Sequence, residues 1–302
     1  MKTFSLITAA LVFSFAIFSC AALMQVTDAG AQLAGAAGVI DKNTVSAVSN
    51  SSKAIGSAAE EITPQQEYFI GRAVAGNILT TYKLYNGNPA LNAYLNKICA
   101  SIVINSPRPD IYNGYHVGIL DSNEINAFAT SGGHILVTRG LISAAASEDA
   151  LAGVIAHEIA HIQLQHSIKA IKSSRITQAL MVTGTSAAGA ASGMNVNQLT
   201  DVFNESVGEI VQTMVTNGYS QTQEYDADNK ALSLMASAGY NPQGLIDMLN
   251  QLKAIQSKSG GGFNKTHPSP DQRIANLTKS INKYKVADNS ASRKARFQAA
   301  VK

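Results

Sequence analysis

The chain has 302 residues, of which 46% are hydrophobic and 14% charged, and this fits a globular protein of one large domain with extensions. The formal net charge of +3, without a basic stripe, argues against a nucleic-acid-binding protein, so we expect no nucleic-acid partner. The two cysteines, Cys20 and Cys99, exclude a scaffold built on several disulfides.

The first residues have the pattern of an export signal. A short, positively charged start precedes an apolar run at 4–18, which is too short to span a bilayer comfortably. Ile-Phe-Ser-Cys at 17–20 resembles the lipobox of bacterial lipoproteins, in which the cysteine becomes the lipidated N-terminus. We therefore expect a signal peptide at 1–19 and a lipid anchor at Cys20 in the outer membrane, facing the periplasm. Plain cleavage near Ala21, giving a soluble periplasmic protein, is the alternative.

The next segments predict a tether and two helices. Residues 20–60 are rich in small and polar residues and contain no aromatic residue, which predicts a flexible tether. A helix is predicted from 64 to about 84, with Thr63 as its cap and proline at its first position. Asn-Gly-Asn-Pro at 86–89 ends it, and a second helix is predicted at 90–105.

A β region follows these helices. Its strands are predicted in three segments: 116–121, 125–130 and 134–138. We expect a small antiparallel sheet with one edge exposed beside the next helix. An exposed edge can bind an extended peptide as an additional strand. We place that edge at 126–130 and expect Asn126, Ala127 and Phe128 to contact a polypeptide substrate.

The most informative stretch is His157-Glu158-Ile-Ala-His161. Ser147 is a suitable N-cap and many apolar residues follow it, so the stretch predicts a largely buried helix. On a helix, His157 and His161 project from one face and can hold a single Zn²⁺ at roughly 2.0–2.1 Å each. Glu158 lies beside them, where a general base for a metal-activated water is needed. The alternative is a buried helix with two hydrogen-bonded histidines.

Two further segments follow this helix. Residues 173–197 contain many small residues, and we expect a helical hairpin or a loop over the cleft rather than a membrane-contacting hairpin. An amphipathic helix is predicted at 199–217, ended by Gly218.

A third ligand is needed, because a catalytic zinc takes three from the protein. No histidine follows at the metzincin spacing, and His166 is expected to face away from an ion held by His161. Glu224 and Asp228 lie four residues apart on a predicted helix and share a face. Glu224 can bind zinc, and Asp228 can accept a hydrogen bond from a ligand histidine. A solvated acidic turn is the alternative.

Several motifs occur in an order typical of one family. They are Asn126-Ala-Phe-Ala, Gly132-Gly133-His-Ile, Val137-Thr-Arg-Gly140-Leu, His157-Glu-Ile-Ala-His161, Gly218-Tyr-Ser-Gln, Glu224-Tyr-Asp-Ala-Asp228, Thr266-His267-Pro268 and Arg273-Ile274. The chain thereby resembles the soluble bacterial branch of the CaaX-prenyl-protease-like family of gluzincin metallopeptidases. The resemblance implies that Glu224 is the third ligand of one Zn²⁺ per chain and that Asp228 supports the ligands from behind.

His267 lies in a polar segment that follows a run of glycines. It can donate to an oxyanion during catalysis or take the open fourth position at the metal in a resting state, and a turn histidine is the alternative. Arg273 is expected to anchor this segment or to pair with Asp228 or another carboxylate. We expect the metallopeptidase domain at 61–285 and a basic tail at 286–302, without the tetratricopeptide repeats of the resembled branch.

With the resemblance, these features predict an α+β, mainly helical fold: a zincin-like catalytic domain with a small antiparallel sheet and an HExxH active-site helix. The predicted function is a zinc endopeptidase of the bacterial envelope, acting in quality control or assembly of outer-membrane proteins together with the outer-membrane assembly machinery. The alternative is a chaperone or scaffold for that assembly whose peptidase is latent.

Overall fold

The computed structural model describes residues 62–171, 207–208, 210–259, 267–286 and 288–301. The expected signal peptide, the tether, Cys20 and the segment at 173–197 lie outside the described residues. In the described part of the chain, no helix combines the length and the apolar character that crossing a bilayer requires.

The first two described helices confirm the sequence prediction. α4 spans Pro64–Thr81 and begins at a capping box, in which Thr63 accepts from the backbone of Gln66 and the Gln66 side chain accepts from the backbone of Thr63. It ends before the predicted boundary because Tyr82 is extended, and the chain then makes a single bridge to the sheet. α5 spans Pro89–Ile104 behind the cap Asn88.

The sheet has three strands, and its pairing corrects the prediction. β1 is His116–Leu120, β2 is Ala127–Thr130 and β3 is His134–Thr138, in the spatial order β1-β3-β2. β2 and β3 are antiparallel and joined by the 3₁₀ turn Ser131–Gly133, but β1 pairs parallel to β3. The sheet is therefore mixed and not antiparallel.

The loop between β1 and β2 explains this order. Thr138, at the end of β3, donates through Oγ1 to the carbonyl of Glu124 at 2.6 Å and accepts from the backbone N–H of Asn126 at 3.1 Å. These bonds fix the loop at the far end of β3, so β2 returns along one side of β3 and β1 occupies the other. Sequence neighbours often pair in order, and this loop overrides that tendency.

The other regular elements of the described chain are helices and helical turns: α6 Arg139–Ala144, α7 Glu148–Gln163, α8 His166–Ile171, the π-helical turn Thr213–Asn217, α12 Gln221–Ser237, α13 Gln243–Ser259, α14 Pro270–Thr278, the 3₁₀ turn Ile281–Lys283 and α15 Ser290–Val301. Of the helix predicted at 199–217, the described residues from 207 are helical and end at Gly218, whose φ of 73° lies in the left-handed region that glycine favours. The mainly helical α+β prediction is thus confirmed.

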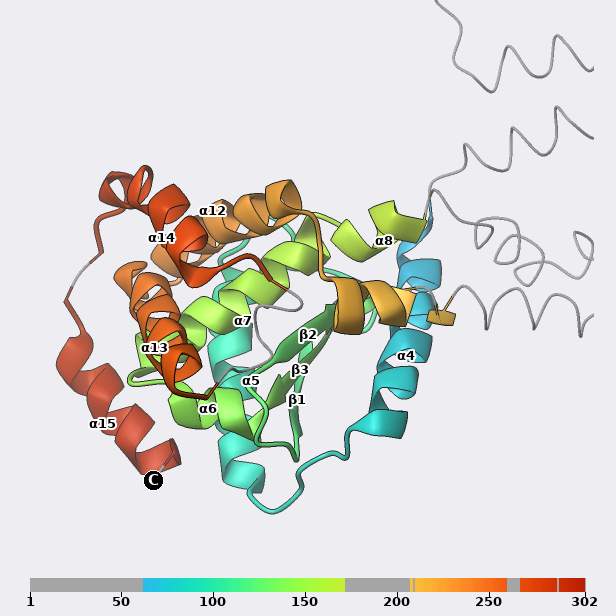
Figure 1. The fold of residues 1–302 in the computed structure, drawn as a ribbon, viewed down its shortest axis with the longest axis horizontal. Helices are drawn as coiled ribbons and strands as arrows, with labels where there is room; N and C mark the ends of the chain where they lie inside the picture. The colour runs from blue at the N-terminus through green and yellow to red at the C-terminus, as the bar shows by residue number, and fades with distance from the viewer. Residues whose placement is uncertain (1–61, 172–206, 209, 260–266, 287, 302) are drawn as a thin grey trace, which may run out of the picture. The chain divides into compact units, whose positions relative to one another are not determined.

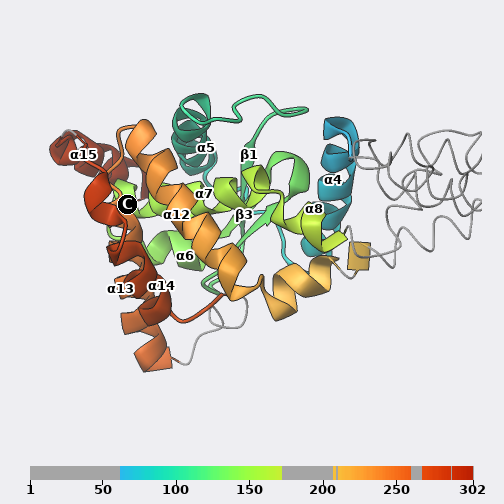
Figure 2. The ribbon, with the colours of Figure 1, turned by 90° about the horizontal axis from the view of Figure 1, so that it is seen from above.

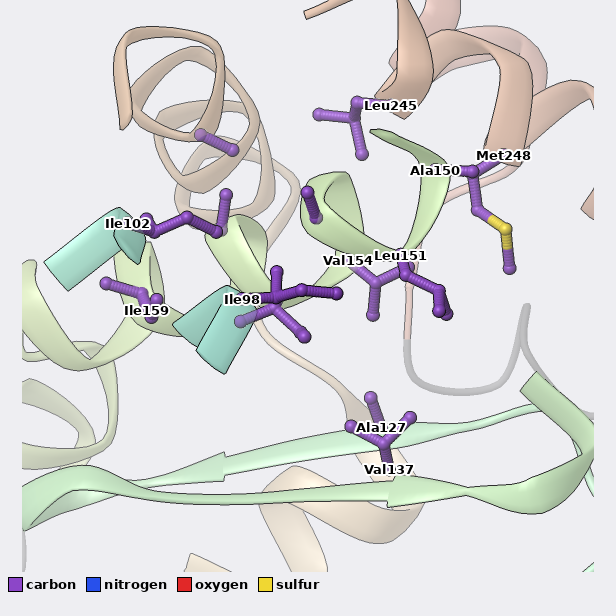
Figure 3. Close-up of a cluster of buried hydrophobic side chains, with 14 of the residues drawn as sticks. Ile98, Ile102, Ala127, Val137, Ala150, Leu151, Val154, Ile159, Leu245 and Met248 are labelled. Atoms are coloured by element: carbon purple, nitrogen blue, oxygen red, sulfur yellow. The ribbon is translucent and has the colours of Figure 1, made fainter. Parts of the chain in front are cut away.

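α7 lies at the centre of this unit. It packs on α12 and α13 on one side and on α5 and the sheet on the other (Figures 1 and 2). Figure 3 shows Leu151 and Val154 of α7 above Ala127 and Val137 of the sheet. Because α7 is covered on both sides, nearly all of its residues are buried, which agrees with its apolar sequence.

The C-terminal segment differs from the predicted basic tail. α15 is packed against the core through Phe297, and Arg293 is also buried. Arg293 Nε donates to Asp149 Oδ2 at 2.9 Å, and Arg296 makes two hydrogen bonds to the carboxylate of Glu148. These acids lie in the first turn of α7, so Arg293 and Arg296 have specific partners and the segment is not a fully solvated tail.

Candidate active site

α7 positions the two histidines and the glutamate of the HExxH stretch. Ser147 Oγ accepts from the backbone N–H of Ala150 at 3.1 Å and caps the helix, as predicted. His157, Glu158 and His161 all lie on this helix and are buried. Burial of three polar side chains is costly unless each has a partner, so their neighbours define the site.

Glu224 comes from α12 and meets both histidines. The Nε2 atoms of His157 and His161 are 3.0 Å apart. Glu224 Oε2 lies 3.6 Å from His157 Nε2, and Glu224 Oε1 lies 3.5 Å from His161 Nε2. Two donors about 2.0–2.1 Å from one tetrahedral zinc would be roughly 3.3 Å apart, so the three spacings match the requirement of a shared ion.

The hydrogen bonds of these residues also fit a metal. Glu224 is fully buried, and its Oε1 accepts no hydrogen bond from the part of the chain that the structure describes. A buried carboxylate oxygen without a donor is expensive, and a cation satisfies it. The donor set of two imidazoles and one carboxylate is one that catalytic zinc uses, so the residues fit Zn²⁺.

His267, just before α14, also contacts Glu224. Its Nδ1 lies 2.7 Å from Glu224 Oε2, and its ring centroid is 5.7 Å from that of His157. Potential ligand atoms of His157, Glu224 and His267 all lie within 4.8 Å of one another. The structure therefore brings His267 to the site, on the side of Glu224.

Asp228 and Arg273 lie behind His157. Asp228 Oδ1 is 3.0 Å from His157 Nδ1, and Arg273 donates to both Asp228 oxygens, at 2.9 Å from Nε and 2.6 Å from Nη2. With its Nδ1 proton donated to Asp228, His157 presents an unprotonated Nε2 toward Glu224 and His161. Arg273 pairs with Asp228, which is one of the two arrangements expected from the sequence.

The carboxylates of the site differ in their electrostatic surroundings. Burial alone would raise the pKa of Glu224, but His267 and His157 hold that pKa well below its usual range. The pKa of Asp228 is likewise lowered, since Arg273 and His157 outweigh its burial. Burial raises the pKa of Glu158, which makes no comparable hydrogen bonds in the described structure. Two acids are thus held as anions, and a third is more basic than usual.

Two residues at the site were not predicted from the sequence. His166 Nδ1 lies 2.9 Å from His161 Nδ1, and the ring of Tyr219 stacks on His161 with centroids 4.4 Å apart and planes at 22°. As expected, His166 does not face the side of His161 that could hold an ion, since it meets the opposite ring nitrogen. In the sequence, the one signal that could have pointed to Tyr219 is its position in Gly218-Tyr-Ser-Gln, directly before α12.

The expected substrate edge is only partly at the site. β2 does lie at an edge of the sheet, but the edge is not exposed as expected, because all residues from Asn126 to Thr130 are buried. Ala127 lines a pocket that also contains His157 and Glu158. Phe128 points to the opposite face, where its ring lies 5.6 Å from that of Tyr82. Asn126 Oδ1 accepts from the backbone N–H of Ala127 at 2.9 Å, so its side chain shapes the start of the strand.

The pocket beside Glu158 is small, with a cavity volume of about 20 Å³, which is room for about one water molecule. His157, Glu158, His267 and Arg273 form its polar end. Its remaining wall is apolar and comes mainly from α6, α7 and α13: Leu141, Val154, Leu245, Met248, Leu249 and Leu252. The polar groups at one end and the aliphatic side chains elsewhere suit an apolar group next to the reacting atoms, once those side chains move apart to admit it.

Comparisons with known proteins agree with this geometry. The chain is 24% identical over 231 residues to the beta-barrel assembly-enhancing protease of Escherichia coli K12, covering 76% of this chain and 46% of that protein. It is 28% identical over 156 residues to the metalloprotease LoiP of the same organism, covering 52% of this chain and 58% of LoiP. It is 27% identical over 186 residues to the mitochondrial metalloendopeptidase OMA1 of Schizosaccharomyces pombe, covering 61% and 51%.

The chain spans about half the length of these curated relatives. A family model described as peptidase family M48 matches residues 89–281, which include α7, Glu224, Asp228, His267 and Arg273. The family consists of metallopeptidases, and the match runs from α5 through α14 without leaving out any part of the candidate site. The chain therefore belongs to peptidase family M48.

Proposed function

We propose that this protein is a zinc-dependent endopeptidase of the bacterial cell envelope. The observation that carries the proposal is that His157 Nε2 and His161 Nε2 lie 3.0 Å apart in a buried site, and that each faces one carboxylate oxygen of Glu224, at 3.6 Å and 3.5 Å. Such a set holds one ion and leaves a fourth position for a reacting group.

The residues divide the work of peptide hydrolysis. A zinc ion bound here would supply Lewis-acid polarisation of the scissile carbonyl and activation of the attacking water. Glu158, next to His157 on α7, takes the proton of that water and delivers it to the leaving amine. Asp228 and Arg273 keep His157 in the tautomer that binds metal through Nε2. His267 donates to the oxyanion when it leaves Glu224.

The substrate is an extended polypeptide with an apolar side chain near the scissile bond. β2 is an edge strand, and strand addition at Asn126, Ala127 and Phe128 requires the elements that bury these residues to move aside; Ala127 also borders the pocket. The aliphatic wall of that pocket suits an apolar side chain, with Glu158 at the polar end where the reacting carbonyl must lie.

The setting proposed for the protein is the periplasmic side of the outer membrane. The export pattern at 1–19 and the lipobox-like residues before Cys20 support a lipid anchor. Similarity to proteins named beta-barrel assembly-enhancing protease supports a role in quality control or assembly of outer-membrane proteins, near the assembly machinery.

A matched pair of proteins tests the peptidase. Zinc content and casein cleavage are measured for the purified full chain and for Glu158→Gln, which keeps the size of the side chain but removes the base. We expect one zinc per chain in both proteins and a loss of cleavage of about 10²-fold or more in the variant. Full activity of Glu158→Gln would show that the proposed mechanism is wrong.

A latent peptidase that acts as a chaperone or scaffold is the second candidate. Two observations support it: His267 contacts Glu224, and the side chains of His157, Glu158 and His161 are buried. A substrate therefore has little access to these residues. In cells, a deletion strain and a Glu158→Gln strain separate the two functions. Equal defects in both strains support the peptidase, and a defect in the deletion strain alone supports the scaffold.

A further inference from the structure

The two histidines on α7 have different partners behind them. His157 Nδ1 faces a carboxylate, Asp228, at 3.0 Å. His161 Nδ1 instead faces a second histidine, with His166 Nδ1 at 2.9 Å and the two rings crossing at 77°. His166 is buried, with 2% of its surface exposed, although it lies only one residue beyond the break between α7 and α8.

The direction of this hydrogen bond follows from the chemistry of imidazole. Two nitrogens at hydrogen-bond distance need one proton between them, so one Nδ1 donates and the other accepts. If His161 uses Nε2 to bind a metal, its Nδ1 must carry the proton and donate. His166 is then the acceptor, with its own proton on Nε2.

The backbone around His166 is built to hold it there. Gln165 has φ of 55° in the left-handed region, which is unusual for a residue other than glycine. Its backbone N–H donates to the carbonyl of Ile162 at 3.0 Å, and its side chain donates to Glu67 Oε2 at 3.3 Å. The break after α7 thus turns the chain so that the next residue points back toward His161.

Tyr219 restricts the ring of His161 from another direction. Its ring stacks on His161 at 4.4 Å and lies 5.7 Å from the ring of His166. Stacking restricts the plane of His161, and the hydrogen bond to His166 restricts rotation within that plane. The position of His161 Nε2 is therefore set from outside the metal site.

We propose that His166 is a positioning residue for the ligand His161: it accepts the Nδ1 hydrogen of His161 and so presents His161 Nε2 to the ion. The inference rests on the proposed zinc site. His166 does for His161, as a neutral acceptor, what Asp228 does for His157 as an anion. The two ligands consequently differ in how strongly their partners draw on the Nδ1 proton.

Zinc affinity of the full chain, measured by competition with a chromophoric chelator, tests the proposal with two substitutions. His166→Leu removes the acceptor, and we expect affinity to fall about 10–100-fold. His166→Asn keeps an acceptor, because Asn Oδ1 takes about the place of Nδ1 on the same Cγ, and we expect affinity within about threefold of the parent protein. If His166→Leu does not fold, His166→Ala makes the same removal with a smaller side chain.

The readouts separate positioning from structural support. A purely structural role would lower the urea midpoint of the metal-free protein in proportion to the loss of affinity, whereas positioning lowers affinity beyond that change. His116→Asn is the matched control, since His116 is an exposed histidine bonded through Nε2 to the carbonyl of Asn113 and should leave zinc affinity unchanged.

Parent-like zinc affinity in a folded His166→Leu protein would overturn the proposal, as would equal losses in the leucine and asparagine variants. Failure of the parent protein itself to bind zinc would instead contradict the proposed function.

Discussion

Asp228 Oδ1 lies 3.0 Å from His157 Nδ1 and 2.6 Å from Arg273 Nη2, so one buried carboxylate serves a candidate metal ligand and an arginine together. Arg273 Nη2 is itself 3.2 Å from His157 Nδ1. Arg273 Nη2 and the Nδ1–H of the neutral His157 both donate to this one carboxylate oxygen, which allows the two donors to lie close together.

Removal of Asp228 should therefore be costly even without metal. We expect Asp228→Leu to destabilise the metal-free protein by about 3–5 kcal/mol, because the buried Arg273 loses the carboxylate that accepts hydrogen bonds from its Nε and Nη2. Adding Arg273→Leu should recover part of this loss, since the buried guanidinium is then gone as well. Urea denaturation gives the three free energies of unfolding.

The control for this pair is an ion pair on the surface. Lys253 Nζ and Asp271 Oδ1 also form a short contact, but their side chains are 55% and 66% exposed. Lys253→Met should change the free energy of unfolding by less than about 1 kcal/mol. A comparable loss in both proteins would mean that burial does not set the cost.

Bound zinc should stabilise the fold, because the ligands come from α7 and α12 and bring them together. At a free zinc concentration of 100 times the dissociation constant, the expected gain is about 2.7 kcal/mol. This gain is measured by thermal or urea unfolding of the protein with zinc, after treatment with a chelator, and after zinc is added back. His161→Gln should unfold at the same point with and without zinc, and a zinc-dependent shift in that variant would place the stabilising ion elsewhere.

Cys99 should be unreactive in the folded protein. Burial raises the pKa of its thiol from about 9 to about 12, so only about one molecule in ten thousand carries the thiolate at pH 8. Alkylation by iodoacetamide, followed on the peptide that contains Cys99 by mass spectrometry, should be at least about a hundredfold slower than in urea. Rapid labelling of the native protein would contradict the burial of this residue.

The same shift gives a pH dependence with a definite sign. Above pH 9 the unfolded chain releases the Cys99 proton and the folded chain keeps it, so stability falls as the pH rises from about 9 to 12. Cys99→Ala should lose this component of the alkaline slope. An unchanged slope in that variant would assign the effect to other groups.

Two glycines of α4 provide a matched comparison of packing. A Cβ on Gly71 would lie 1.5 Å from the carbonyl oxygen of Ser131, whereas a Cβ on Gly76 would meet nothing within 4 Å. Alanine improves helix propensity by about 0.5–1 kcal/mol at either position. We expect Gly76→Ala to be stabilising by that amount and Gly71→Ala to be destabilising by about 1–3 kcal/mol, because α4 must move away from the turn after β2.

The difference between the two free energies of unfolding is the quantity to measure, since helix propensity cancels in it. Equal effects would indicate that α4 and the turn at Ser131 do not pack as closely as the structure has them.

Local spacing explains which parts of the site the sequence could predict. His157 and His161, and again Glu224 and Asp228, are four residues apart, and on a helix this spacing alone places each pair on one face. The caps Ser147 and Ser220 fix where those helices begin. The resemblance to a known family supplied the pairing of the two helices, which spacing cannot give.

Features that depend on a break in regular structure could not be predicted in this way. His166 follows a left-handed residue, Gln165, and helical periodicity says nothing about where the chain points after such a turn. The order of the strands depends on Thr138 holding the loop at Glu124, a contact between distant residues. The packing of α15 similarly depends on acids at the start of α7: Glu148 lies 148 residues before its partner Arg296.

The contacts that hold the two ends of α7 form at different times as the chain is synthesised. Arg108 and Glu67 hold one end of the helix, through the carbonyl of Ile162 and the side chain of Gln165, and Arg296 holds the other at Glu148. During synthesis Glu148, in the first turn of α7, meets Arg296 only after a further 148 residues have been added. A chain that ends before Arg296 has the HExxH sequence but lacks the two hydrogen bonds that hold the first turn of α7 at Glu148.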